Sequence, residues 1–235
     1  MKNLFLLIIS ICSICKIYAQ PSRSVFGAGM VKYNKHDYTG AIRDFDQVLE
    51  GCPDDIITLS VRGDSKFALH DFRGAIEDYD KVIKIAPKLF NVLYNRGTAK
   101  FSIEDFKGAV EDFSHAIEFK HNDPDYFYNR GTAYAKLNDY TNAILDFDRT
   151  IELNSDYGNA YFNRGWIKFE LKDYTGAIMN YDKSIALNIN FAEAYFNRGL
   201  AKFQIRQRSE AIKDWRLAKK LGYIDTSAML QKYAK

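Results

Sequence analysis

Residues 90–123 read FNVLYNRGTAKFSIEDFKGAVEDFSHAIEFKHND, and the same pattern returns every 34 residues along the chain. Glycine occupies the eighth position of this unit, alanine the twentieth and an aromatic residue the twenty-fourth. The glycines lie at 29, 63, 97, 131, 165 and 199, the alanines at 41, 75, 109, 143, 177 and 211, and the aromatic residues are Phe45, Tyr79, Phe113, Phe147, Tyr181 and Trp215. Three columns that keep one period six times indicate an internal repeat.

Six units follow from this numbering, at residues 22–55, 56–89, 90–123, 124–157, 158–191 and 192–225. Within each unit, two apolar stripes of helical spacing flank a short polar break. In the third unit, Leu93 and Phe101 mark the first stripe, while Ala109, Phe113 and Ala116 mark the second. Each unit is therefore predicted to be a hairpin of two helices.

The polar break carries an aspartate followed by an aromatic residue in five units: Asp37, Asp71, Asp105, Asp139 and Asp173. Its carboxylate can accept hydrogen bonds from the unpaired N–H groups that open the second helix. A glycine inside a helix costs about 1 kcal/mol relative to alanine, so the glycine column predicts a close approach of two helix backbones. The alanine column is then the matching small surface, and the aromatic column is expected to fill the space between successive hairpins.

The pattern resembles the tetratricopeptide repeat (TPR) family, which shares the period, the small glycine, the alanine and the aromatic residue four positions later. Arginine precedes the glycine in five units, at Arg62, Arg96, Arg130, Arg164 and Arg198. Asparagine precedes that arginine in four of them, and this triplet resembles the asparagine-arginine-glycine subgroup. The resemblance implies an all-α fold, a right-handed α-solenoid of six helical hairpins over residues 20–235, with a C-terminal capping helix at 226–235 and first helices that line a concave groove.

Residues 1–19 are predicted to be a secretory signal peptide. Lys2 precedes an apolar run from Leu4 to Cys15, and a small residue, Ala19, ends the segment. A retained membrane anchor is the alternative, but twelve residues span only about 18 Å of a hydrocarbon core that is ~30 Å thick. The protein is therefore expected to be exported, as a periplasmic or secreted protein with no membrane span after cleavage.

Composition and motifs argue against several functions. Of the 235 residues, 33 are basic and 30 acidic, so the chain lacks the strong positive field that binding to nucleic acid requires. Gly27-Ala28-Gly29 lacks the third glycine of a dinucleotide loop, and the four histidines show no metal-ligand spacing. Paired acids such as Asp146 and Asp148 lie on different faces of a helix and make a poor chelate. We therefore predict no catalytic residue, no metal site and no cofactor.

Arg96 and Lys100 lie four apart on one helix row, which is unfavourable unless a negative group faces them. Asp112 on the second helix of the same unit is the candidate partner. The same pairing is expected for Arg62 with Asp78, Arg130 with Asp146 and Arg198 with Asp214, whereas Asn180 is expected to break it for Arg164. A structural ladder is favoured over direct ligand contact because a partly buried arginine requires a partner.

The geometry of the family implies that the second, fifth, sixth, ninth, twelfth and thirteenth positions of each unit face the groove. The implied contact residues are Tyr94, Tyr128, Phe162 and Phe196 at the fifth position, Asn95, Asn129, Asn163 and Asn197 at the sixth, Trp166 at the ninth, and Phe67, Phe101, Phe169 and Phe203 at the twelfth. Asparagine can both donate to and accept from a peptide backbone, and aromatic rings supply apolar contact area. The alternative is that these side chains only pack successive first helices against each other.

These features favour a non-catalytic adaptor or scaffold of the bacterial envelope that binds a peptide or protein segment in its groove. The lysine and asparagine that the family uses to clamp a C-terminal carboxylate are missing from the fifth and ninth positions, so a chaperone adaptor is not expected. Two alternatives remain. The groove aromatics can bind an envelope glycan, or the solenoid can be a purely structural protein whose ends form oligomers.

Overall fold

A computed structural model describes residues 19–188, 190–224 and 226–233, which contain thirteen helices and no strand. The predicted all-helical fold is therefore confirmed. Apart from Ala19, the predicted signal peptide lies outside the described residues. Within the described ranges, no helix has the length and apolar character needed to cross a membrane.

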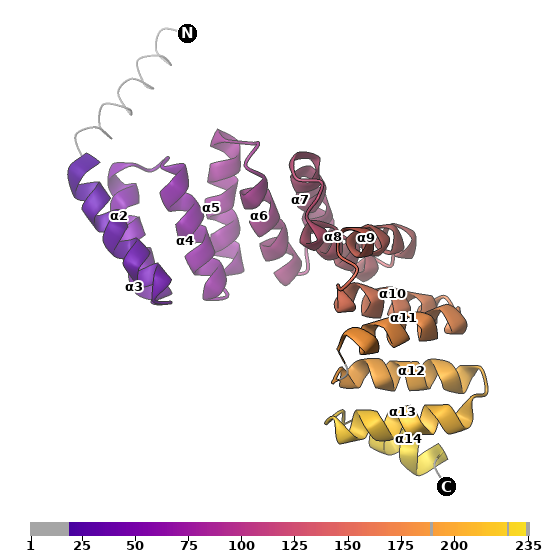
Figure 1. Ribbon diagram of the computed structural model, residues 1–235. Helices are drawn as coiled ribbons and strands as arrows, with labels where there is room; N and C mark the ends of the chain where they lie inside the picture. The colour runs from indigo at the N-terminus through magenta and orange to yellow at the C-terminus, as the bar shows by residue number, and fades with distance from the viewer. Residues whose placement is uncertain (1–18, 189, 225, 234–235) are drawn as a thin grey trace. The chain divides into compact units, whose positions relative to one another are not determined.

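The chain divides into two compact units, residues 1–120 and residues 121–235. In the N-terminal unit, hairpins pair α2 (Ala19–Asn34) with α3 (Tyr38–Gly51), α4 (Ile56–Ala68) with α5 (Phe72–Ile85), and α6 (Phe90–Ser102) with α7 (Phe106–Phe119). In the C-terminal unit, they pair α8 (Pro124–Lys136) with α9 (Tyr140–Leu153), α10 (Gly158–Glu170) with α11 (Tyr174–Leu187), and α12 (Ala192–Gln204) with α13 (Arg208–Lys220). The final helix, α14 (Thr226–Tyr233), packs on α13 (Figure 1).

The turn inside each hairpin has one repeated geometry. The residue at the fifteenth position has a positive φ of 59° to 65° in all six hairpins. The N–H of the following residue then returns to a carbonyl in the last turn of the first helix, as Asp105 does to Lys100 at 2.9 Å. The predicted caps are confirmed in five hairpins, where the aspartate accepts from the backbone N–H three residues later at 2.9–3.2 Å. In the sixth hairpin, Gln207 makes no side-chain cap bond.

The glycine and aromatic columns pack against each other within each hairpin. A Cβ added to Gly97 would lie 2.8 Å from Cε1 of Phe113, and one added to Gly63 would lie 2.7 Å from Cε1 of Tyr79. The predicted close approach is thus confirmed, but the main partner is a ring edge of the second helix rather than its backbone. Only glycine leaves room for the buried ring at this distance.

The core runs from one hairpin to the next. All six alanines of the twentieth position are fully buried, and the six aromatic residues of the twenty-fourth position are at most 1% exposed. Tyr79 shares a cluster with Leu49 of the preceding hairpin and with Val92 and Ala99 of the following one. The aromatic residue of the second hairpin therefore packs against both neighbouring hairpins, as expected for this column. At the C-terminal end, the ring of Tyr233 in α14 lies 4.5 Å from that of Phe203, between ring centroids.

Candidate functional site

The arginine column holds neighbouring hairpins together. Arg96 donates from Nε and Nη2 to the two oxygens of Asp112, at 2.8 and 2.5 Å. Its Nη1 donates to Asp80 of the preceding hairpin at 2.6 Å. Asp112 is buried and Asp80 is exposed, so one guanidinium joins a buried carboxylate of its own hairpin to a surface carboxylate of the one before.

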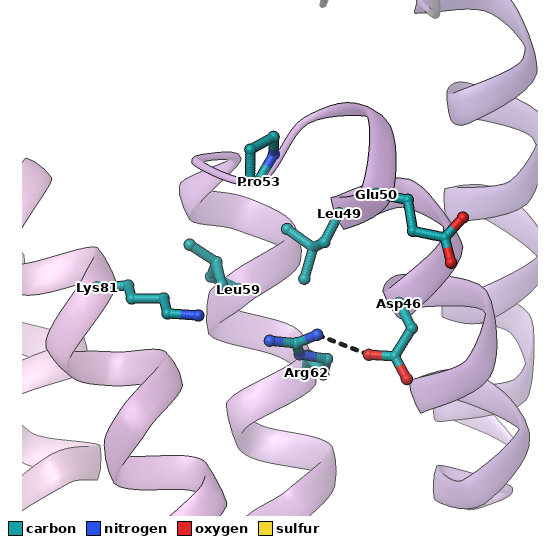
Figure 2. A pocket seen from close by; sticks show the side chains of 7 residues that line it. All are labelled: Asp46, Leu49, Glu50, Pro53, Leu59, Arg62 and Lys81. Carbon is teal, nitrogen blue, oxygen red and sulfur yellow. Dashed lines mark hydrogen bonds and ion pairs between the residues drawn. The ribbon is translucent and has the colours of Figure 1, made fainter.

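Arg62 and Arg198 repeat this arrangement. Arg62 is bidentate to Asp78 and bonds Asp46, while Arg198 is bidentate to Asp214 and bonds Asp182. Figure 2 shows Arg62 reaching Asp46 from α4 to α3, beside a hollow of about 360 Å³. The hydrogen bonds from Arg62 to Asp78 raise the pKa of Arg62 above its ordinary value. Burial of the guanidinium opposes this rise.

In three hairpins the lysine four residues after the arginine uses the same buried carboxylate. Lys100 lies 2.9 Å from Asp112, and Lys66 and Lys202 lie 2.8 Å from Asp78 and Asp214, between Nζ and Oδ2. The predicted negative partner of the arginine–lysine row is therefore confirmed. In the C-terminal unit, Arg130 is likewise bidentate to Asp146, at 2.8 and 2.7 Å.

The expectation that Asn180 breaks the ladder at Arg164 is wrong. Arg164 donates from Nε to Oδ1 of Asn180 at 2.7 Å, and Asn180 donates in turn to the carbonyl of Gly176. An amide oxygen accepts as a carboxylate does, so the bond from Nε survives, while the second bond of the bidentate pair and one charge are lost. Arg164 also bonds Asp148 of the preceding hairpin. Acids two positions apart, such as Asp146 and Asp148, thus serve two successive arginines.

The predicted fifth-position rings are half-buried and occupied by packing. The ring centroids of Tyr94 and Phe113 lie 5.6 Å apart, and Tyr128 lies 5.9 Å from Phe147. The other two fifth-position rings also pack on neighbouring rings. Phe162 packs on Tyr181 and Phe191, and Phe196 packs on Tyr223. Packing between helices, the alternative raised above, therefore accounts for much of this row.

The twelfth-position rings close the hairpin turns. Phe101 meets Phe106 edge-on at 5.2 Å, and Phe169 meets Tyr174 at 5.4 Å, between ring centroids. Phe67 and Phe203 likewise pack on Phe72 and Tyr233. Trp166 is the most open of the predicted rings, with 36% of its surface exposed and its ring edge-on to Tyr140.

Some asparagines of the sixth position form hydrogen bonds with other side chains of the protein, whereas Asn197 does not within the described part of the chain. Asn95 donates to Oδ1 of Asp64 at 2.9 Å, and Asn163 donates to the hydroxyl of Tyr128 at 3.1 Å. One repeat later the residue equivalent to Tyr128 is Phe162, which has no hydroxyl. Among the described residues, the amide of Asn197 accordingly has no hydrogen-bond partner, which leaves it available to a ligand.

The first helices of the N-terminal unit line a cavity of about 420 Å³. Side chains from the first helices α2, α4 and α6, with one tyrosine from α5, line it: Tyr33, Asp64, Phe67, Ala68, Tyr79, Tyr94, Asn95 and Thr98. The structure thus brings the predicted Phe67, Tyr94 and Asn95 together in one place. It does not place the other predicted residues in this cavity.

Sequence analysis missed the central residue of this cavity, Asp64. A signal for it exists, because Asp64 is the only charged residue in the ninth-position column, where Met30, Thr98, Thr132, Trp166 and Leu200 are its equivalents. The aromatic column of the same hairpin has Tyr79, whose hydroxyl donates to Oδ1 of Asp64 at 2.7 Å. The two departures from the repeat pattern therefore belong to one polar contact.

Burial raises the pKa of Asp64, and the hydrogen bonds from Tyr79 and Asn95 oppose that rise. Burial, with the nearby charge of Asp64, also raises the pKa of Tyr33. No lysine or arginine of the described residues forms an ion pair with Asp64. The cavity is therefore lined mainly by aromatic rings and contains one carboxylate, Asp64, that has no cationic partner among the described residues.

The described residues contain no group of three histidine, cysteine, aspartate or glutamate side chains that could hold a metal ion. The side chains that line the cavity provide ring faces, an amide, hydroxyl groups and a carboxylate. These groups suit non-covalent recognition.

Family models match the repeats directly. A model described as "Tetratricopeptide repeat" matches residues 124–157, and one described as "TPR repeat" matches residues 98–138 and 165–205. The matched segments are similar to tetratricopeptide repeats. The hairpins that contain them share their helix order and turn geometry with the other hairpins of both compact units.

Solved structures share this TPR fold. MamA is 29% identical, with a TM-score of 0.65 over 73% of this chain and 97% of MamA. YrrB, described as a TPR protein with an unusual peptide-binding site, is 21% identical, with a TM-score of 0.68 over 80% of this chain and 97% of YrrB. A TPR protein from Parabacteroides merdae is 18% identical, with a TM-score of 0.63 over 97% of this chain and 93% of that protein. No curated protein sequence matches the chain significantly.

Proposed function

We propose that this TPR protein is a non-catalytic adaptor that binds an extended protein segment on the inner wall of its hairpins. TPR folds support a role in protein–protein interaction, and the cavity around Asp64 is the observation that carries the proposal here. It opens between three successive first helices and offers both ring faces and hydrogen-bonding groups. A segment that lies across α2, α4 and α6 would contact all of them. In the C-terminal unit, Asn197 and Trp166 would contribute an amide and an exposed ring.

The glycan alternative receives less support from the ring geometry. Sugars stack on open ring faces, but most rings of the fifth and twelfth positions pack on neighbouring rings. Trp166 is the residue on which a sugar would best stack.

We also propose export to the bacterial envelope, which rests on Lys2, the apolar run and Ala19 at the N-terminus. N-terminal sequencing of the exported protein is the check, and a mature chain beginning at Gln20 is expected. Membership of the asparagine-arginine-glycine subgroup is likewise a proposal, supported by triplets such as Asn163-Arg164-Gly165.

A displayed random-peptide library panned on the full-length protein tests the adaptor function. Ala68 and Glu77 are both exposed residues of the N-terminal unit, and only Ala68 lines the cavity. Peptides selected by the wild type should bind the Glu77→Trp variant equally well and should lose binding to Ala68→Trp, whose ring fills the cavity rim. Selected peptides that bind both variants equally, or selection of no peptide at all, would contradict groove binding. In the second case, binding of envelope glycan that Trp166→Ala abolishes would favour the glycan function.

A further inference from the structure

We propose that the cavity of the N-terminal unit takes a basic side chain, arginine or lysine, of the bound segment, with Asp64 as its ion-pair partner. This inference rests on the proposed adaptor function, because the basic residue belongs to the segment that the groove binds. It adds a chemical class to that segment. It also assigns a specificity-determining role to Asp64.

The charges of the unit give the first argument. Three other shielded carboxylates of the N-terminal unit have a cation of their own: Asp44 lies 2.7 Å from Lys32, Asp78 pairs with Arg62, and Asp112 pairs with Arg96. The half-buried Asp55 instead caps the N-terminus of α4. Asp64 is half-buried as well, yet among the described residues it has only neutral donors. A shielded carboxylate without a cation is costly in the free protein, and an incoming cation removes that cost.

The contacts of the carboxylate give the second argument. Tyr79 and Asn95 both donate to Oδ1 of Asp64, at 2.7 and 2.9 Å. Oδ2 takes part in no hydrogen bond of the described residues, and it is not among the polar atoms sealed from solvent. Tyr79 and Asn95 therefore fix the carboxylate and leave one oxygen able to accept from a ligand. Both an ammonium and a guanidinium group can donate to it.

The walls give the third argument. Tyr33, Phe67 and Tyr94 line the cavity from α2, α4 and α6. Ring faces attract a cation, and they also contact the apolar stem that leads to the charged end of lysine or arginine. An acidic side chain would meet repulsion from Asp64. An uncharged apolar side chain would bury the carboxylate further without compensating its charge.

The pKa of Asp64 provides an independent readout on the free protein. Because burial raises this pKa above the unfolded value of 3.8, the ionised carboxylate lowers the stability of the folded state at neutral pH. As the pH falls below the pKa of Asp64 in the unfolded chain, Asp64 is protonated in both the folded and the unfolded state, and the loss of stability disappears. The facing tyrosines Tyr33 and Tyr79, whose pKa values are raised chiefly by burial, stay neutral throughout this range. The Asp64→Asn variant should therefore melt at a higher temperature than wild type at pH 7, with a difference that vanishes in acid.

Binding is tested with the peptides that the wild type selects. The selected peptides should share an arginine or lysine at one position, and this enrichment should be absent when the library is panned on Asp64→Asn. Asp54→Asn is the matched control, because Asp54 is an exposed residue of the same unit that does not line the cavity. Replacing the shared arginine by citrulline, which keeps the shape and removes the charge, should weaken binding to wild type about tenfold or more, or about 1.4 kcal/mol. The same replacement should change binding to Asp64→Asn less than about twofold.

Each result separates the two proposals. Selected peptides that bind in the groove but carry no basic preference would overturn the role of Asp64 and leave the adaptor function standing. An equal citrulline effect on wild type and Asp64→Asn would place the basic residue elsewhere and overturn the inference as well. Failure of the wild type to select any peptide that Ala68→Trp rejects would overturn both. A melting temperature of Asp64→Asn below that of wild type at pH 7 would contradict the uncompensated charge.

Discussion

In the turn of each hairpin, the residue at the fifteenth position has a backbone conformation of unfavourable free energy. Its φ lies near +60°, a region that glycine and asparagine tolerate and other residues adopt at a cost of about 1 kcal/mol or more. Asn138 is the favourable case among the six. His36, His70, Glu104, Lys172 and Arg206 hold the same conformation because the hydrogen bonds of the turn fix it.

Replacing Lys172 by glycine should therefore stabilise the protein by about 0.5–1 kcal/mol, the gain from relieved strain less the entropy that glycine adds to the unfolded chain. Urea denaturation measures the free energy of unfolding. Lys183 is a matched control, because it is an exposed lysine inside α11. There the same substitution should destabilise by about 1 kcal/mol. A loss of stability for Lys172→Gly would show that the lysine side chain contributes more than the strain costs.

At the scale of the element, Arg62, Arg96 and Arg198 each join two second helices through carboxylates of unequal burial. Arg198 is bidentate to Asp214, which is buried, and bonds Asp182, which is exposed. Lys202 also depends on Asp214. The buried carboxylate compensates two cations in a shielded setting, whereas solvent weakens the pair with Asp182.

Asp214→Ala should accordingly destabilise the protein by about 3 kcal/mol or more, and Asp182→Ala by less than about 1 kcal/mol. Asp214→Asn should cost less than Asp214→Ala, because Asn180 keeps the equivalent bond to Arg164. Thermal and urea denaturation of the three variants measure these differences. Equal losses for Asp214→Ala and Asp182→Ala would contradict the unequal roles of the two carboxylates.

At the scale of the whole molecule, the fold is a series of local contacts. Within each compact unit, a helix contacts the helices next to it or one further along the chain. A fold of this kind has a stability that is roughly a sum over repeats and their interfaces. A local defect should therefore lower the stability of its own hairpins first.

Gly97→Ala provides such a defect, because the added Cβ would meet the buried ring of Phe113 at 2.8 Å. Overpacking of this kind costs about 1–3 kcal/mol. In native-state hydrogen exchange, α6 and α7 should lose protection while α12 and α13 keep it. Gly27→Ala in α2 is the control, since nothing lies within 4 Å of its added Cβ, and its protection should not fall. Equal loss of protection in every helix would indicate one cooperative fold instead.

The repeat pattern was sufficient to predict the fold, because helical hairpins and their order depend on local patterns that repeat. The glycine, alanine and aromatic columns specify how one hairpin packs on the next, and the aspartate cap marks where the second helix begins. The arginine–aspartate pairs were also predictable, since a charge on a packed row requires a partner. The contacts of Arg62, Arg96, Arg164 and Arg198 with an aspartate of the preceding hairpin were missed, because only stacking brings that carboxylate near.

Which side chains of the first helices are free to contact a ligand could be learned from the tertiary structure alone. A ring or amide in an inward column can face solvent or pack on a neighbour, and that choice depends on side chains 30 or more residues away, as with Asn163 and Tyr128. For the same reason the cavity around Asp64 could not be read from the repeat pattern. Its tyrosines and carboxylate come from four helices, and their distances depend on how closely those helices pack.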